Sequence, residues 1–310
     1  MKIEKILIAG AGTMGYSMAQ IFARYGYKVT MYDVSDTALS NARQRIFENM
    51  TTLAEEGEIT PEVKDHIIDS LAYTTDKQAF ADCDLVVESI IENLDIKKSF
   101  YAEISKIVRK DTILATNTSG LSINALASAV EGPERFIGMH WFNPSHLILL
   151  IEIIKGDATT DEVAKTIRDL ALSIDKKPVT VEKDVPGFVA NRIQFAVLRE
   201  SLDLVEKGVI SMEDVDSVMK YGLGFRYACL GPLEVADFGG LDTFHHISEY
   251  LMKDLCASPD VPKLLADHFD KGELGVKTGK GFYDYSGDKA VKATESRDEK
   301  LLAVYRALYK

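Results

Sequence analysis

The sequence lacks the features that mark membrane, disulfide-stabilised and zinc-binding proteins. No apolar run reaches the ~18 residues that a membrane-spanning helix needs. The segment before the first apolar run, residues 1–5, leaves no room for a signal peptide. The three cysteines (Cys83, Cys229 and Cys256) are far apart and form no Cys-x-x-Cys motif. We therefore expect a cytoplasmic protein with no membrane partner, no disulfide framework and no bound metal.

An excess of basic residues is also missing. The chain has 48 acidic and 36 basic residues, and its formal net charge is −12. Nucleic-acid binding depends on clustered Lys and Arg that neutralise phosphates, so we expect no nucleic-acid partner. Any anionic small-molecule substrate must instead meet local positive groups.

The first part of the chain alternates between short apolar segments and helical patterns. Strands are predicted at residues 5–10, 28–33, 84–90, 112–118, 136–141, 150–156 and 177–182. Helices are predicted at residues 13–25, 36–56 and 60–70. Alternation of this kind predicts an α/β fold with a doubly wound parallel sheet of the Rossmann type.

The pattern changes near Val185-Pro186-Gly187. A long helix is predicted at residues 188–207, and most of the remaining chain shows no convincing strand. We therefore expect two domains, residues 1–184 with the sheet and residues 185–310 as an all-α domain.

A glycine-rich motif follows the first predicted strand. It is G-x-G-x-x-G, built from Gly10, Gly12 and Gly15 with Thr13 and Met14 between the last two glycines. Because the motif lies between a strand and a helix, it predicts a dinucleotide-binding turn whose backbone approaches the pyrophosphate. The N-terminus of the following helix then offers free N–H groups to the phosphates.

Asp33 lies 18 residues after Gly15, at the end of the second predicted strand. A carboxylate at this position accepts hydrogen bonds from the ribose hydroxyls of NAD and repels the 2′-phosphate of NADP. The next residues, Val34-Ser35-Asp36, contain no arginine that would offset this repulsion. The sequence therefore predicts NAD as the cofactor. A helix N-cap is the alternative role for Asp33, although Ser35 or Asp36 suits that role better.

His140 and Glu152 form the candidate catalytic pair. Glu152 lies inside an apolar strand, where an unpaired carboxylate is costly. Two consecutive strands joined by a turn could bring it to His140, whose tautomer it would fix and whose basicity it would raise. Oxidation of an alcohol needs such a base for the hydroxyl proton. The alternative is a structural histidine with its hydrogen bonds satisfied.

Several further motifs occur in the same order. They are Asn117-Thr118-Ser119, the stretch from His140 to Pro144, Glu152, Pro186-Gly187-Phe188 with Asn191-Arg192, and residues 277–283 (KTGKGFY). Together they resemble the 3-hydroxyacyl-CoA dehydrogenase family over residues 4–285. The resemblance implies an N-terminal Rossmann domain and a helical C-terminal domain that binds substrate and forms a homodimer.

The resemblance also implies roles for individual residues. His140 would be the base and Glu152 its partner, while Ser119 and Asn191 would hold the reacting oxygen. Asn143 would help to place the substrate and the nicotinamide. The family positions that contact NAD are matched by Glu92, Lys97 and Lys277. Simpler roles stay open: Ser119 could cap a helix, Asn191 could be a polar group at a helix start, and Lys97 with Lys98 could form a solvated face.

Two departures from the family concern the substrate. Acyl-CoA members carry lysines on the helix after the second strand, but residues 48–58 here contain four glutamates and no Lys or Arg. Asn49 and Glu56 stand at the family's CoA-contacting positions. A carboxylate near a CoA phosphate is unfavourable by ~1 kcal/mol even in near-bulk water. CoA could instead bind Arg43 or Arg45, or this helix could be only a solvated acidic face.

The second departure is Gly222-Leu223-Gly224-Phe225-Arg226-Tyr227. It resembles the branch that includes gulonate dehydrogenase and carnitine dehydrogenase, which act on free hydroxy acids. Arg226 could hold a substrate carboxylate through two hydrogen bonds. Alternatively, it could pair with Glu234 or Asp237.

These observations predict an NAD-dependent dehydrogenase that interconverts an L-3-hydroxyacyl compound and its 3-keto product. A short-chain substrate of the 3-hydroxybutyryl-CoA type comes first, which would place the enzyme in fatty acid metabolism. A free 3-hydroxy carboxylic acid is the alternative. A catalytically silent NAD-binding protein is a remote third, because both His140 and Glu152 are present.

Overall fold

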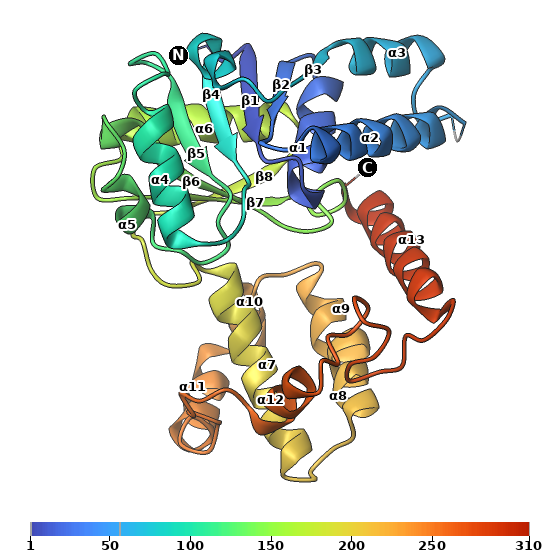
Figure 1. Ribbon diagram of the computed structural model, residues 1–310. Coiled ribbons are helices and arrows are strands. Elements are labelled where there is room, and N and C mark those ends of the chain that lie inside the picture. The colour runs from blue at the N-terminus through green and yellow to red at the C-terminus, as the bar shows by residue number, and fades with distance from the viewer. Residues whose placement is uncertain (1, 56, 310) are drawn as a thin grey trace. The chain divides into compact units, whose positions relative to one another are not determined.

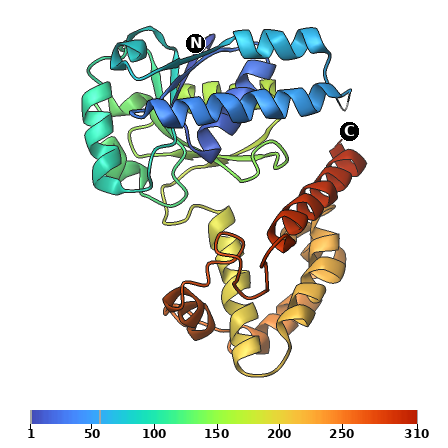
Figure 2. The same ribbon diagram turned by 45° about the vertical axis from the view of Figure 1, so that its right-hand side comes forward.

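The computed structural model describes residues 2–55 and 57–309, and it divides the chain into two compact units. The first unit comprises Met1–Arg192 and the second comprises Ile193–Lys310. Figures 1 and 2 show a unit built on a sheet and a unit built from helices. We describe each unit by itself.

The first unit contains an eight-stranded sheet with the order β3-β2-β1-β4-β5-β6-β7-β8. The strands are β1 (Lys5–Ala9), β2 (Lys28–Tyr32), β3 (Leu71–Thr74), β4 (Leu85–Glu88), β5 (Ile113–Thr116), β6 (Phe136–Trp141), β7 (Leu150–Lys155) and β8 (Lys177–Val181). Only the pairing of β6 with β7 is antiparallel. The predicted strands are all present, within two residues at their ends. β3 was not predicted from the sequence; it is short, and Leu71 is its only buried residue.

Helices cover both faces of this sheet (Figure 1). Ile6 and Ile8 of β1 pack in one apolar cluster with helices α1 (Thr13–Arg24), α2 (Asp36–Glu55) and α6 (Asp161–Ser173). The alternate residues Leu7 and Ala9 pack in a second cluster with α4 (Leu94–Ile104) and α5 (Ile123–Ala127). Successive side chains of a strand point to opposite faces, so a strand that is apolar throughout belongs in a sheet covered on both sides. Helix α3 (Pro61–Asp69) packs near α1 and α2.

The second unit is entirely helical within the residues described. Its helices are α7 (Ala190–Glu206), which starts at the end of the first unit, α8 (Met212–Val218), α9 (Gly224–Tyr227), α10 (Pro232–Gly239), α11 (Leu241–Leu251), α12 (Lys263–Asp270) and α13 (Lys289–Tyr309). Helix α7 begins two residues later than predicted, because Gly187 and Phe188 adopt positive φ angles of 74° and 52°. The predicted fold class, a Rossmann-type sheet followed by helices, is confirmed.

The chain passes from the first unit to the second within the first turn of α7, since the division lies between Arg192 and Ile193. The sequence placed the domain boundary at residue 184, and the functional assignment of residues 1–184 and 185–310 stays a prediction. Among the described residues, no helix combines the length and the apolar character that crossing a membrane requires.

Candidate active site

The glycine-rich turn leaves open space in front of α1. A Cβ on Gly10, whose φ is +110°, would lie 2.4 Å from the backbone oxygen of Ser89. A Cβ on Gly15 would lie 1.9 Å from the backbone oxygen of Gly10, so both positions exclude a side chain. By contrast, a Cβ on Gly12 would meet nothing within 4 Å.

This open space lies at the N-terminus of α1. Gly12 is the N-cap residue, no side chain caps the helix, and its first turn, which starts at Thr13 and Met14, carries no acidic residue. The first N–H groups of a helix have no partner within the helix and favour an anion. The turn therefore fits the pyrophosphate of a dinucleotide, with the backbone of Gly12 free to approach it.

Asp33 follows β2 directly and reaches the same turn. One of its carboxylate oxygens accepts a hydrogen bond from the backbone N–H of Ala11 at 2.8 Å, and the other accepts one from Ser35 at 3.0 Å. These bonds hold the carboxylate beside the glycine-rich turn. This is the position that a partner for the ribose hydroxyls must occupy.

His140 and Glu152 lie directly opposite each other on neighbouring antiparallel strands, β6 and β7. The Nδ1 atom of His140 lies 2.9 Å from Oε2 of Glu152. The other carboxylate oxygen accepts hydrogen bonds from the backbone N–H groups of Val189 and Ala190, at 3.0 and 2.9 Å. Both side chains are buried. The expected turn between two strands thus brings the pair together.

The hydrogen bonds keep Glu152 ionised. Burial alone would raise the pKa of its carboxyl, but the bonds from His140, Ala190 and Val189 outweigh burial and hold the pKa below its ordinary value. A carboxylate at this position accepts the proton on Nδ1 of His140. The Nε2 atom is then left as the proton acceptor of the neutral ring.

Two aromatic rings lie beside His140. The ring centroid of Phe142 is 4.4 Å away and that of Phe188 is 5.7 Å away. Phe188 is fully buried, and it lies next to the backbone amides that bind Glu152. Sequence analysis cited Phe188 only as part of the resemblance.

The structure brings Ser119 and Asn191 together. The side-chain amide of Asn191 donates a hydrogen bond to the backbone oxygen of Ser119 at 2.7 Å. Ser119 is exposed and Asn191 is half-buried. Ser119 does not cap α5; that role belongs to Ser122, whose hydroxyl accepts from Ala125. Asn191 lies in the first turn of α7.

Lys97 is buried rather than part of a solvated face, so that alternative is wrong. Its ammonium pairs with Glu88 and lies 3.2 Å from an oxygen of Glu92. The second oxygen of Glu92 accepts the hydroxyl of Thr118 and, at 2.9 Å, the backbone N–H of Ser119. These contacts link the predicted NAD-contacting residues Glu92 and Lys97 to Ser119.

Glu88 anchors this network, and sequence analysis missed it. Its carboxylate also accepts hydrogen bonds from Tyr101 at 3.2 Å and from Thr116 at 2.8 Å. Glu88 ends an apolar strand, as Glu152 interrupts one. The argument that identified Glu152, an acid in an apolar strand, would have identified Glu88 too.

Asn143 is exposed in the loop between β6 and β7, and its peptide bond to Pro144 is cis. The two remaining candidates, Arg226 and Lys277, belong to the second unit. Arg226 lies in α9 with its guanidinium 5.9 Å from the ring centroid of Tyr227. In the described part of that unit, no ion pair joins Arg226 to Glu234 or Asp237. Lys277 is exposed in the segment after α12.

The described glutamates of residues 48–58 lie at the surface. Glu48 and Glu55 are exposed, and Glu48 accepts a hydrogen bond from Gln44 rather than from a base. Arg43 and Arg45 lie over the rings of Tyr73 and Tyr16, at 5.7 and 5.9 Å. Asn49 donates to the side chain of Gln20 at 3.0 Å. Glu56 lies outside the described residues.

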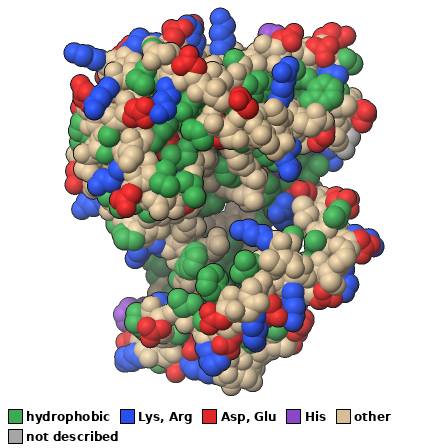
Figure 3. All heavy atoms as spheres, viewed as in Figure 1, with side chains coloured by type: hydrophobic (Ala, Val, Ile, Leu, Met, Phe, Trp, Pro, Cys, Tyr) green, Lys and Arg blue, Asp and Glu red, His purple; other side chains and the backbone are tan. Residues whose placement is uncertain are grey.

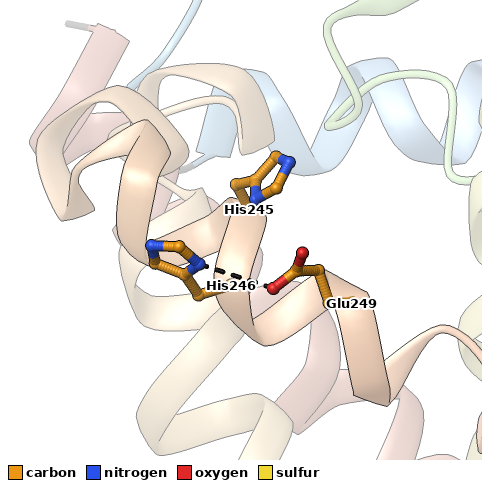
Figure 4. Close-up of side chains that lie close together, drawn as sticks. All are labelled: His245, His246 and Glu249. Atoms are coloured by element: carbon orange, nitrogen blue, oxygen red, sulfur yellow. Dashed lines mark hydrogen bonds and ion pairs between the residues drawn. The ribbon is translucent and has the colours of Figure 1, made fainter.

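A cluster of possible metal ligands lies on α11 (Figure 4). It consists of His245, His246 and Glu249, whose ligand atoms lie within 4.8 Å of one another. All three side chains are exposed on one helix. His246 lies 3.5 Å from Glu249, and its ring centroid lies 5.6 Å from that of His245. Metal-binding histidines are usually held by further hydrogen bonds, and among the described residues neither histidine has a hydrogen-bond partner outside this cluster.

The chain is similar to known enzymes along most of its length. Residues 5–185 match the NAD-binding domain of 3-hydroxyacyl-CoA dehydrogenase, and residues 187–285 match the C-terminal domain of that enzyme. A 5-formyl-3-hydroxy-2-methylpyridine 4-carboxylate 5-dehydrogenase from Mesorhizobium japonicum is 40% identical over 307 residues, which is 99% of this chain and 98% of the relative. A probable 3-hydroxybutyryl-CoA dehydrogenase from Deinococcus radiodurans is 40% identical over 282 residues, covering 91% of this chain and all of the relative.

A solved structure supports the same assignment. The crystal structure of a 5-formyl-3-hydroxy-2-methylpyridine 4-carboxylic acid 5-dehydrogenase, described as an NAD⁺-dependent dismutase, superposes with a TM-score of 0.91 and 40% identity, covering 99% of both chains. The predicted cofactor NAD is thereby confirmed, as is the prediction of an NAD-dependent dehydrogenase. A glycine-rich turn that fits a dinucleotide, a buried histidine–glutamate pair and these matches lead to one conclusion: the chain belongs to the 3-hydroxyacyl-CoA dehydrogenase family.

Proposed function

We propose that the enzyme oxidises a hydroxyl group with His140 as the general base. The observation that carries this proposal is the buried pair of His140 and Glu152, with Nδ1 and Oε2 at 2.9 Å. Glu152 keeps the proton on Nδ1, so Nε2 can take the proton of the substrate hydroxyl. NAD, when bound, accepts the hydride. In the reverse direction, the protonated His140 returns its proton to the carbonyl oxygen.

Ser119 and Asn191 would hold the reacting oxygen. Their mutual hydrogen bond fixes the side chain of Asn191 near Ser119. The backbone of Ser119 is in turn tied to Glu92, and Glu92 to Lys97. A group that must stabilise a developing charge is most effective when its position is set in advance. Asn143 would contact the substrate from the β6–β7 loop.

We infer that the preferred substrate is a compact free carboxylic acid. The exposed acidic side of α2 disfavours the phosphates of CoA, and Arg226 has no carboxylate partner of its own among the described residues. The relative from Mesorhizobium japonicum, which matches the chain nearly end to end, is named for a pyridine carboxylate. Arg226 would bind the substrate carboxylate.

A short-chain 3-hydroxyacyl-CoA thioester is the second candidate. It is favoured by the relative from Deinococcus radiodurans, named a probable 3-hydroxybutyryl-CoA dehydrogenase, and by the family models. Such a substrate would require the CoA phosphates to bind away from the glutamates of α2. Fatty acid metabolism would then be the setting of the enzyme.

The experiment is to measure NADH formation with 3-hydroxybutyryl-CoA, with free 3-hydroxybutyrate and with a hydroxymethylpyridine carboxylate. Arg226→Gln should raise the KM of a free acid by about tenfold or more, the value of one charge-assisted interaction, and leave the KM of a thioester within twofold. Arg297→Gln, an exposed arginine on α13, is the matched control. Turnover of the thioester alone would contradict the free-acid proposal, and turnover of none would leave it without support.

We also propose that the enzyme is a homodimer formed by the helical unit. Large apolar side chains are exposed along this unit, among them Leu233 and Phe238 of α10, each 81% exposed, and Phe225 of α9, 74% exposed. Hydrophobic side chains lie open on the visible face of the helical unit (Figure 3). Exposed apolar surface of this extent is typical of a protein interface.

A further inference from the structure

Lys176 is buried in the first unit and takes no part in the mechanism above. It is 4% exposed and lies between α6 and β8. The residue before it, Asp175, has a φ angle of 57°, and this left-handed turn ends α6. Tyr25, at the end of α1, donates a hydrogen bond from its hydroxyl to the Asp175 carboxylate. The turn and this hydrogen bond therefore fix the direction in which the side chain of Lys176 points.

The ammonium group of Lys176 binds the loop between β6 and β7. It donates hydrogen bonds to the backbone oxygens of Ser145 and, at 2.8 Å, Ile148. It also lies 5.4 Å from the centroid of the Trp141 ring, next to His140 in the sequence. The described residues place no carboxylate in an ion pair with it, and burial lowers the pKa of Lys176 to about 8.

The loop bound by Lys176 carries Asn143. Within it, the backbone N–H groups of Leu147 and Ile148 donate to the oxygen of Pro144 at 3.1 and 3.0 Å, which closes a turn. The carbonyl groups of this turn and of the residues beside it cannot all be satisfied within such a short segment. Lys176 supplies the partners that Ser145 and Ile148 lack, so it sets the shape of the connection from Asn143 to β7.

The same loop is also bound from α1, the helix that follows the glycine-rich turn. The hydroxyl of Ser17 hydrogen-bonds the hydroxyl of Ser145, and both side chains are buried. The loop is therefore fixed between the cofactor-binding helix on one side and Lys176 on the other. Ser145 belongs to both contacts, through its side chain and through its backbone oxygen.

We propose that Lys176 is a positioning residue for the reaction. It holds the 142–149 loop so that Asn143 meets the substrate and the nicotinamide at the distance that hydride transfer requires. This inference rests on the proposed function of Asn143 and His140. Lys176 does not touch the reacting atoms, because its contacts lie on the Trp141 side of β6, and neighbouring strand residues point to opposite faces.

The test compares Lys176→Met with the wild type in the full-length enzyme. Methionine keeps most of the buried volume and removes the donors. We expect kcat to fall by about 30-fold, somewhat less than the roughly 10²-fold that a displacement of ~1 Å at a reacting centre can cost. The dissociation constant for NADH, from fluorescence titration, should stay within threefold, because the glycine-rich turn is unchanged. Amide hydrogen exchange of Leu147 and Ile148 should become at least tenfold faster.

Lys177→Met is the matched control, since Lys177 is the exposed neighbour and its loss changes the net charge equally. It should leave kcat and loop exchange within twofold. Lys176→Arg keeps the hydrogen-bond donors and the charge. Its decrease in log kcat should be at most half of the decrease that Lys176→Met causes. If Lys176→Met does not fold, Lys176→Gln replaces it, with the same direction of effect.

Two results would overturn the proposal. One is a folded Lys176 variant with kcat and exchange of Leu147 and Ile148 within twofold of the wild type. The other is a loss of rate that equals the loss of folded protein, which would show a purely structural role. The rate assay uses whichever of 3-hydroxybutyrate or 3-hydroxybutyryl-CoA the wild type oxidises. If it oxidises neither of these nor the hydroxymethylpyridine carboxylate, the proposed function fails, while hydrogen exchange still decides whether Lys176 holds the loop.

Discussion

The two units of the molecule differ most in which apolar and charged side chains they bury. The first buries two large apolar clusters and, between strands and loops, a set of charged side chains that includes Glu88, Lys97, Glu152 and Lys176. In the described part of the second, from Ile193 onward, Leu202 and Val235 are the only buried hydrophobic side chains. The first unit is thus organised around an interior, whereas the second presents its hydrophobic side chains at its surface.

This difference indicates where a catalytic site is expected and where a protein interface is expected. A buried charge is retained only when other groups hold it, so a network of held charges marks a site with fixed geometry. Exposed apolar side chains mark surface that a partner can cover. The histidines of the two units differ in the same way. His140 is buried against Glu152, while His245 and His246 are exposed on α11.

The strongest test of this contrast replaces one histidine in each unit. His140→Asn should lower kcat by about 10³-fold, because the hydroxyl proton loses its acceptor. His246→Asn should leave kcat within twofold. Steady-state rates of NADH formation measure both, with circular dichroism to verify folding. A His140→Asn enzyme with near-normal rate would refute the proposed base.

A second test addresses the apolar surface of the helical unit. Phe238→Glu, combined with Leu233→Glu, should raise the dissociation constant of the proposed dimer by about 100-fold or more, since each change places a charge in a buried interface. Analytical ultracentrifugation over a concentration series measures the constant. Val34→Glu, an exposed apolar residue of the first unit at 83% exposure, is the control. A wild-type protein that is monomeric at all concentrations would contradict the dimer.

A third test separates the two roles of Glu152. Glu152→Gln should lower kcat by about 50-fold, because the ring of His140 loses its charged partner, an effect smaller than loss of the base. The pKa of Glu152 is lowered in the folded state, so its ionised form stabilises the fold above the ordinary value of 4.5. That contribution is lost as pH falls through the lowered pKa.

The free energy of unfolding should therefore decrease below pH 4.5 more steeply in the wild type than in Glu152→Gln. Urea denaturation at pH 7, 5 and 3.5 measures the difference. Parallel curves for the two proteins would show that the carboxylate is not held as the structure indicates.

The smallest expected effects concern NAD binding by residues of the two units. Asp33→Ala should raise the dissociation constant for NAD by about tenfold, the cost of a charge-assisted hydrogen bond. Lys277→Ala should raise it by about threefold, because exposed charges contribute little. Isothermal titration calorimetry measures both constants. A larger effect of Lys277 than of Asp33 would reverse the assignment of cofactor binding to the first unit.

Much of the first unit could be predicted from sequence because its signals are local. The apolar strands, the glycine-rich turn and Asp33 depend on neighbouring residues and on a fixed spacing. The pairing of His140 with Glu152 was also accessible, since two adjacent strands joined by a short loop form a hairpin. β3 was missed because four residues with one buried side chain give too little pattern to recognise.

The contacts of single side chains across the fold could not be predicted. Lys176 and Lys177 are neighbours in the sequence, yet Lys176 is buried and Lys177 is exposed. Which of the two is buried depends on the left-handed turn at Asp175, which the sequence pattern does not reveal. Lys97 was expected either to contact NAD or to be solvated, and its burial depends on Glu88, nine residues earlier on another element. The proposed role of Arg226 depends on the substrate, which the sequence does not encode locally.

The antiparallel pairing of β6 with β7 has a consequence for how such enzymes diversify. His140 and Glu152 face each other because main-chain hydrogen bonds fix the register of the two strands. The connection between them can therefore gain or lose residues without separating the acid from the base, provided that the register is kept. New substrates could be accommodated by changes in that hairpin loop while the proposed proton acceptor, His140, stays in place.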